Sequence, residues 1–180
     1  MKDLAIYILL NINMSTRATV YVHWVQHNTV KLYHHCDGYV SWLGSRIVDT
    51  MITCGGENVV KSLFEIGGFE VDDVKSIHGD VEYVYDIYVK HESIKMDEKY
   101  QMKTIWRVEV RKWYDEEKIR EQEGIEIGDG WSMSNHNRSW DFEKIERELW
   151  KLENRWRDKP EEETVESLDT DSSFYNAYYS

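Results

Sequence analysis

Residues 81–90 place the tightest limit on what this chain can fold into. Apolar side chains stand at every second position of this stretch, in the order valine, tyrosine, tyrosine, isoleucine, valine. A strict period of two predicts a β-strand with one buried face, because successive side chains of a strand point to opposite sides. Residues 104–113 repeat the alternation with Val108 and Val110 and predict a second strand. We therefore expect a sheet with one face covered by another layer.

The N-terminal half adds a hairpin and two helices. Residues 18–25 and 29–34 are rich in β-branched and aromatic side chains, and the polar turn between them predicts an antiparallel hairpin. Residues 40–54 and 57–66 carry apolar side chains at spacings of three and four, which indicates helices, and each stretch ends at a glycine pair. The order predicts an α+β fold: an antiparallel sheet of two N-terminal strands and two later strands, with two helices on one face.

The C-terminal half contains a third helix and an acidic tail. Residues 139–157 begin at Ser139, a favourable N-cap, and carry one apolar stripe that ends near Pro160. Residues 158–180 hold seven acidic residues and one lysine, which is half of the net charge, and we expect this tail to be disordered. We interpret residues 70–80 as a loop and residues 115–129 as a surface excursion.

The segments define one α+β domain over residues 1–157, followed by the tail. Residues 4–10 are apolar but are too few to span a bilayer or to form a signal peptide, so we expect a short strand there. Met14 is an alternative start, which would make residues 1–13 an N-terminal extension. Two cysteines, Cys36 and Cys54, favour a reducing compartment, and we expect a cytoplasmic protein that does not contact a membrane.

Charge and motif content exclude several classes of function. Lys and Arg number 22 against 34 Asp and Glu, and the resulting net charge of -12 argues against general nucleic-acid binding, which needs a basic face. The sequence contains no Cys-x-x-Cys pair, no phosphate-binding glycine loop and no nucleophile elbow. We therefore predict no metal site, no cofactor and no catalytic residue.

The stretch from Tyr33 to Tyr39 is the most unusual local sequence, because it places two histidines and an aspartate where the second strand passes into the first helix. Ligands are often held at such junctions. The predicted binding residues are Arg17, Tyr33, His35, Asp37 and Tyr39. Two other interpretations stay open: Asp37 with Gly38 is also an ordinary turn pair, and His35 with Asp37 could serve a hydrolase or nuclease.

The same residues carry a family resemblance. The chain has Ser-Thr-Arg-Ala at residues 15–18, Tyr-x-His-x-Asp-Gly-Tyr-x-x-x-x-Gly at 33–44, and Glu-Tyr-x-Tyr at 82–85. In this order the motifs resemble an uncharacterised phage and bacterial protein family, over about residues 14–90. His34 stands where that family usually has arginine, and Val40 where it has proline. The resemblance implies a viral or mobile-element protein that acts in a host cytoplasm.

These observations predict a non-enzymatic accessory protein that binds a host or viral protein partner, with inhibition of a defence system as one outcome. The alternative is a small-ligand or nucleotide-binding domain that uses the Tyr33–Tyr39 junction. The stripe on the last helix also leaves a homodimer seam open beside packing within the chain. The stripe consists of Phe142, Ile145, Leu149, Leu152 and Trp156.

Overall fold

The computed structural model describes residues 16–25, 27–112, 123–131 and 140–157, with side chains up to residue 152. The elements in chain order are β1 (Arg17–Trp24), β2 (Val30–His34), the π-helical turn η1 (Val40–Gly44), α2 (Ser45–Cys54), α3 (Val59–Ile66), β3 (Phe69–Asp72), β4 (Val81–Met96), β5 (Lys99–Lys112), β6 (Ile125–Trp131) and α5 (Phe142–Arg157). The predicted segments 1–13 and 158–180, including the strand at 4–10, lie outside the described residues.

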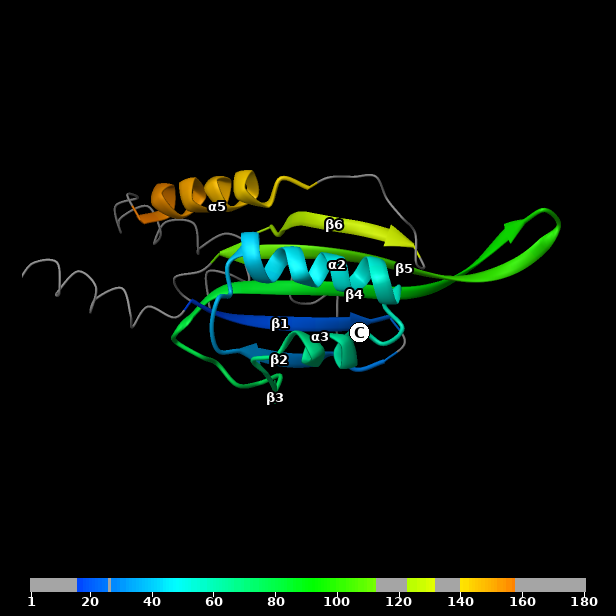
Figure 1. The fold of residues 1–180 in the computed structure, drawn as a ribbon, viewed down its shortest axis with the longest axis horizontal. Helices are drawn as coiled ribbons and strands as arrows, with labels where there is room; N and C mark the ends of the chain where they lie inside the picture. The colour runs from blue at the N-terminus through cyan, green and yellow to red at the C-terminus, as the bar shows by residue number, and fades with distance from the viewer. Residues whose placement is uncertain (1–15, 26, 113–122, 132–139, 158–180) are drawn as a thin grey trace, which may run out of the picture.

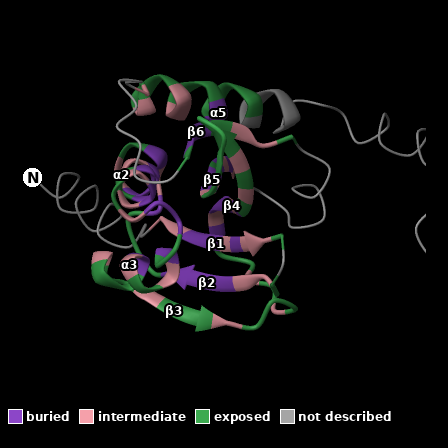
Figure 2. Ribbon diagram, turned by 90° about the vertical axis from the view of Figure 1, so that its right-hand side faces the viewer, coloured by how far each residue is buried: buried purple, intermediate pink, exposed green. Residues whose placement is uncertain are grey.

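The described strands form one six-stranded sheet in the order β3-β2-β1-β4-β5-β6. Helices α2 and α3 lie on one face of this sheet, and α5 runs along its β6 side (Figures 1 and 2). The predicted mixture of strands and helices is confirmed. The predicted antiparallel sheet is confirmed in part: β1 and β4 pair in parallel, while the other neighbours are antiparallel. The elements β2, η1, α2, α3 and β3 all lie between β1 and β4 in the chain, and a parallel pair needs a long connection of this kind.

The sheet also contains two strands where the sequence indicated loops. Residues 69–72 form β3 at one edge, and residues 125–131 form β6 at the other. Glycines allow β6 to pack closely on its neighbours: a Cβ at Gly130 would stand 2.7 Å from Trp106 Cζ2, and one at Gly128 would stand 2.8 Å from a Val48 methyl group. Glycine normally weakens a strand, but here it permits a close approach.

The main core lies between the sheet and the helices. The alternating residues of β4 that the sequence indicated are buried, and Trp106, Val108 and Val110 of β5 meet them. Helix α5 closes the β6 side: Leu149 is buried in this core, and Phe142 and Ile145 pack against it. Glu146 accepts a hydrogen bond from the Ser41 backbone N–H at 3.1 Å and another from the Tyr83 hydroxyl.

Three members of the apolar stripe on α5 are therefore used within the chain. Phe142, Ile145 and Leu149 pack on the core of their own chain, so they do not form an open seam for a second copy. Leu152 is exposed, and the side chain of Trp156 lies outside the described residues. The interpretation of α5 as a helix that packs on its own sheet fits this arrangement.

Candidate functional site

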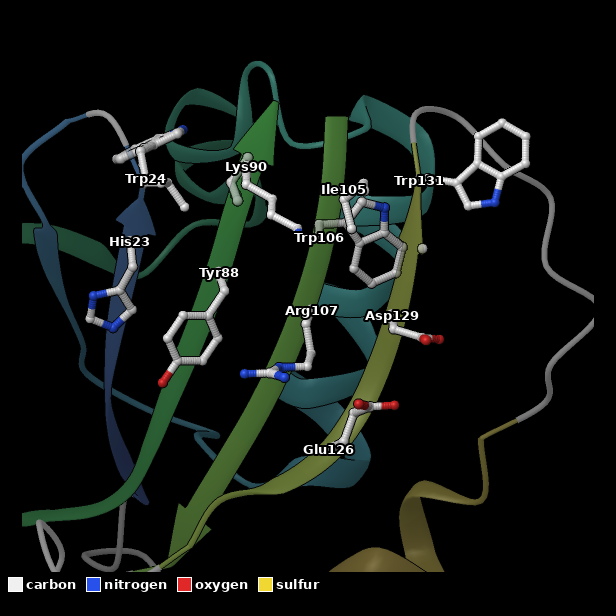
Figure 3. Close-up of a pocket in the computed structure, with 13 residues that line it drawn as sticks. His23, Trp24, Tyr88, Lys90, Ile105, Trp106, Arg107, Glu126, Asp129 and Trp131 are labelled. Carbon is white, nitrogen blue, oxygen red and sulfur yellow. The ribbon is translucent and has the colours of Figure 1, made fainter. Parts of the chain in front are cut away.

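The face of the sheet away from α2 and α3, here called the far face, carries the strand residues that point away from the main core. One cross-strand row on it consists of His23, Tyr88, Arg107 and Asp129. The strand register sets this row: His23 of β1 pairs with Tyr88 of β4, Tyr88 with Arg107 of β5, and Arg107 with Asp129 of β6. Figure 3 shows the four side chains side by side across four strands.

The far face is hollowed at this row. A hollow of about 680 Å³ is lined by the cross-strand row together with Trp24, Lys90, Ile105, Glu126 and Trp131, among others. This volume lies within the range of about 300–1,000 Å³ that is usual for small-molecule sites. Aromatic and aliphatic side chains make part of its wall, and charged groups of both signs stand beside them, which is the usual composition of a ligand pocket.

Rings and a guanidinium stack along the row. The His23 and Tyr88 rings lie 4.9 Å apart at an interplanar angle of 18°, and the Arg107 Cζ lies 5.0 Å from the centre of the Tyr88 ring. Arg107 Nε also forms an ion pair with Glu109 Oε1 at 3.0 Å. Contacts of this kind restrict the rotation of each side chain, so the wall is held in place before a ligand arrives.

Asp86, which lies two residues before Tyr88 on the same face of β4, holds the row in place. His23 Nε2 donates to Asp86 Oδ1 at 2.8 Å, and Arg111 forms an ion pair with the other carboxylate oxygen at 3.0 Å. His23 Nδ1 lies 3.0 Å from the Thr29 hydroxyl, so both ring nitrogens are engaged. Thr29 does not line the hollow. This hydroxyl–imidazole–carboxylate chain therefore orients His23 rather than presenting a nucleophile to a ligand.

Tyr88 stays a neutral hydrogen-bond donor across the physiological range. Burial raises the pKa of its phenol, and the negative charges of Asp86 and Glu109 raise it further, against the lowering effect of the two nearby arginines. The protonated phenol can donate to an acceptor on a ligand.

The five predicted binding residues fall into two groups. Arg17, Tyr33 and His35 come together on the far face: Tyr33 and Arg17 both contact the Asp80 carboxylate, and the Tyr33 and His35 rings lie 4.9 Å apart. Asp37 instead accepts a hydrogen bond from Tyr39 at 3.4 Å, and Tyr39 packs against the main core. The five are not brought into one pocket, and none of them lines the hollow.

A turn at Asp37 separates the two groups. Asp37 has a φ of 53°, in the left-handed region, and Gly38 passes so close to β1 that a Cβ there would stand 2.8 Å from the Ala18 Cβ. The chain thus leaves the far face at this point. His35 pairs with Glu70 at 3.3 Å, not with Asp37, so the residues proposed for a hydrolase do not meet.

The loop that follows β3, residues 73–80, covers the β2 side of the far face. Lys31, which is 1% exposed, forms an ion pair with Asp72 at 2.9 Å and donates to the Ser76 backbone oxygen. His78 also contacts Asp72, at 2.7 Å. Residues 73–80 therefore lie over β2, whereas the hollow over β4, β5 and β6 remains accessible.

Sequence reasoning missed His23, Tyr88, Arg107 and Trp131. The available signal was the polar face of the two predicted strands, where a tyrosine and two arginines stand between the buried residues.

Within the described ranges, no three His, Cys, Asp or Glu side chains gather as metal ligands, and no helix is long and apolar enough to cross a membrane. No family model, curated protein or solved structure matches this chain.

Proposed function

We propose that this protein is a binding protein that holds a small molecule in the hollow on the far face of its sheet. The observation that carries the proposal is the hollow itself, whose wall is assembled from four adjacent strands and is fixed by the stack of His23, Tyr88 and Arg107. A pre-formed concave wall with aromatic side chains and a few oriented polar groups is typical of ligand sites. This moves the ligand-binding alternative from the Tyr33–Tyr39 junction to the cross-strand row.

The far face also favours binding over catalysis. His23 is engaged at both ring nitrogens, and a general base must reach the proton that it abstracts. The chemistry that the hollow supports is therefore recognition through stacking, charge and hydrogen bonds. If the resemblance to phage and bacterial proteins holds, the ligand is one found in a host cytoplasm.

Filling the hollow should abolish binding without unfolding the protein. Ile105 is half-buried in the wall of the hollow, so Ile105→Arg places a long side chain in it, whereas Val71→Arg alters an exposed edge-strand position on β3. We expect ligands found by a thermal-shift screen of small aromatic compounds to lose their shift with Ile105→Arg and to keep it with Val71→Arg. Equal shifts in both variants would place the ligand elsewhere and contradict the proposal.

A second candidate function, binding of a host or viral protein partner, is supported by the end of the β4–β5 hairpin. Beyond residue 90 these two strands extend past the rest of the sheet (Figure 1) and pair, among the described strands, only with each other. Tyr100 and Met102 share one face of this ribbon and are 74% and 68% exposed. Exposed aromatic and methionine side chains beside unpaired strand edges are typical of protein contacts.

The ribbon should be needed for any such partner. We expect a partner captured from host lysate by the wild type to be lost with a Tyr100→Glu, Met102→Glu double variant. The same partner should be retained by Ile105→Arg, which alters the hollow instead. Retention by the ribbon variant, with the partner's identity confirmed by mass spectrometry, would exclude the ribbon as its contact surface.

A further inference from the structure

The charged groups around the hollow are separated by sign. The cationic side chains Lys90 and Arg107 come from β4 and β5, whereas the carboxylates of Glu126 and Asp129 both come from β6. Since the strand order is β1-β4-β5-β6, positive charge lies on one side of the hollow and negative charge on the other. A ligand that matches this pattern has an anionic group at one end and hydrogen-bond donors at the other.

Arg107 is held in a position to bind an anion. Its Nε is engaged by Glu109, and its guanidinium lies over Tyr88, while its two terminal nitrogens have no acceptor among the described residues. In Figure 3 the guanidinium points toward Tyr88, and the Asp129 carboxylate points away from it. Two adjacent guanidinium N–H groups are the donors that bind phosphate or carboxylate in a bidentate manner.

Lys90 supplies a second cation beside Arg107. It lies two residues after Tyr88 on β4 and therefore on the same face, diagonal to Arg107 across the strand pair. Its present partner is Glu92, and both side chains are nearly half exposed, at 47% and 44%. An exposed pair of this kind contributes little to stability, so Lys90 can turn to a ligand anion at low cost.

The β6 side of the hollow suits a planar ring that carries hydrogen-bond donors. Trp131 is 44% exposed and Ile105 lies opposite it in the strand register, so both bring apolar side chains to this side of the hollow. Lys103 Nζ lies 3.5 Å from the centre of the Trp131 ring, and a ligand ring would pack beside this contact. Glu126 is exposed and, as a carboxylate, only accepts hydrogen bonds. Ring amino groups or hydroxyls would satisfy it, whereas a ligand anion on this side would be repelled.

From this separation of charge, which rests on the proposed ligand-binding function, we infer that the ligand class is an aromatic anion: a planar ring bearing hydrogen-bond donors at one end and a phosphate or carboxylate at the other. The anionic group binds Arg107 and Lys90 over β4 and β5. The ring packs beside Trp131 and Ile105, with its donors toward Glu126. A nucleoside monophosphate with an exocyclic amino group has all three features.

Four probes separate these features in a calorimetric titration of the full chain. Adenosine monophosphate carries ring, amino group and phosphate; adenosine lacks the phosphate, ribose phosphate lacks the ring, and inosine monophosphate replaces the amino group by a carbonyl. We expect adenosine monophosphate to bind about tenfold or more tightly than each of the others, because each lost charge-assisted or stacking contact weakens binding by roughly that factor.

Arg107→Gln should remove the advantage of adenosine monophosphate over adenosine. The matched control is Arg46→Gln, which removes another arginine stacked on an aromatic ring, with its Cζ 4.4 Å from the Trp42 ring centre, on the helix side of the molecule. We expect the control to bind adenosine monophosphate as the wild type does.

The failures of the two proposals can be told apart. If adenosine or the N-methylnicotinamide cation binds as tightly as adenosine monophosphate, and this binding is lost with Ile105→Arg, the aromatic-anion inference is wrong and the proposed function stands. If Ile105→Arg leaves the binding of every probe unchanged, the hollow is not the ligand site and both proposals are wrong.

Discussion

Replacing Asp86 with alanine should destabilise the fold by about 3–5 kcal/mol, the usual range for removing one member of a buried ion pair. Asp86 is 5% exposed, accepts a hydrogen bond from His23 Nε2 and forms an ion pair with Arg111. Without it, the Arg111 guanidinium, whose side chain is 19% exposed, stays in place with no compensating charge. Because Asp86 also fixes His23, any ligand binding in the hollow should weaken together with stability.

Urea unfolding at neutral pH, followed by circular dichroism, measures this effect. Glu92→Ala is the matched control, since Glu92 belongs to an ion pair on the same strand with both side chains nearly half exposed, and such pairs contribute about 0–1 kcal/mol. A loss of less than about 1 kcal/mol for Asp86→Ala would mean that the buried network is not holding the far face together.

Asp72→Asn should be the second strongly destabilising change, and it should also alter the response to acid. Burial alone would raise the pKa of the Asp72 carboxyl, but hydrogen bonds from Ser76, Lys31 and His78 outweigh it and hold the pKa well below its ordinary value of 3.8. A carboxyl whose pKa is lower in the folded state stabilises the fold above the unfolded pKa. That contribution is lost as the pH falls below 3.8 toward the folded pKa.

Two results are therefore expected for Asp72→Asn. At neutral pH it should cost about 3–5 kcal/mol, because Lys31 is left buried and charged without its partner. In urea unfolding measured at a series of pH values, the loss of stability below the ordinary carboxyl pKa should be shallower than in the wild type. Asp73→Asn, an exposed neighbour on the same loop, is the control. Parallel acid profiles for wild type and Asp72→Asn would refute this account.

The fold was predictable wherever the hydrophobic period was regular. The alternation in β4 and β5 and the spacing of three and four in α2, α3 and α5 identified these elements, because each buries one face against the main core. The sequence did not reveal β6, since its glycines at 128 and 130 resemble a loop. Glycine is needed at these two positions because of tertiary packing: Val48 and Trp106 occupy the space that a Cβ would take.

Strand neighbours were not predictable from local sequence. The parallel pairing of β1 with β4 joins residues about 65 positions apart in the chain, and no periodicity in either segment specifies it. The short β3 was mistaken for a loop because Glu70 and Asp72 lie within four residues. Their charges are accommodated at an edge, where Asp72 meets Lys31.

The candidate site was harder to predict than the fold, for the same reason. The Tyr33–Tyr39 stretch has an unusual local sequence, but the change of chain direction at Asp37 places Tyr33 and His35 on the far face and Tyr39 against the main core. The cross-strand row is inconspicuous in the sequence, because His23, Tyr88, Arg107 and Asp129 come from four separate segments. Only the strand order and register bring them together.

An amide NMR titration with adenosine monophosphate tests most directly whether the hollow on the far face is the ligand site. We predict that the largest shift changes fall on His23, Tyr88, Arg107 and Trp131, the residues that line the hollow on its four strands. Changes at Asp37 and Tyr39 should be small, because these residues do not line the hollow. Changes concentrated at the Asp37 turn, or on α2 and α3, would contradict the account.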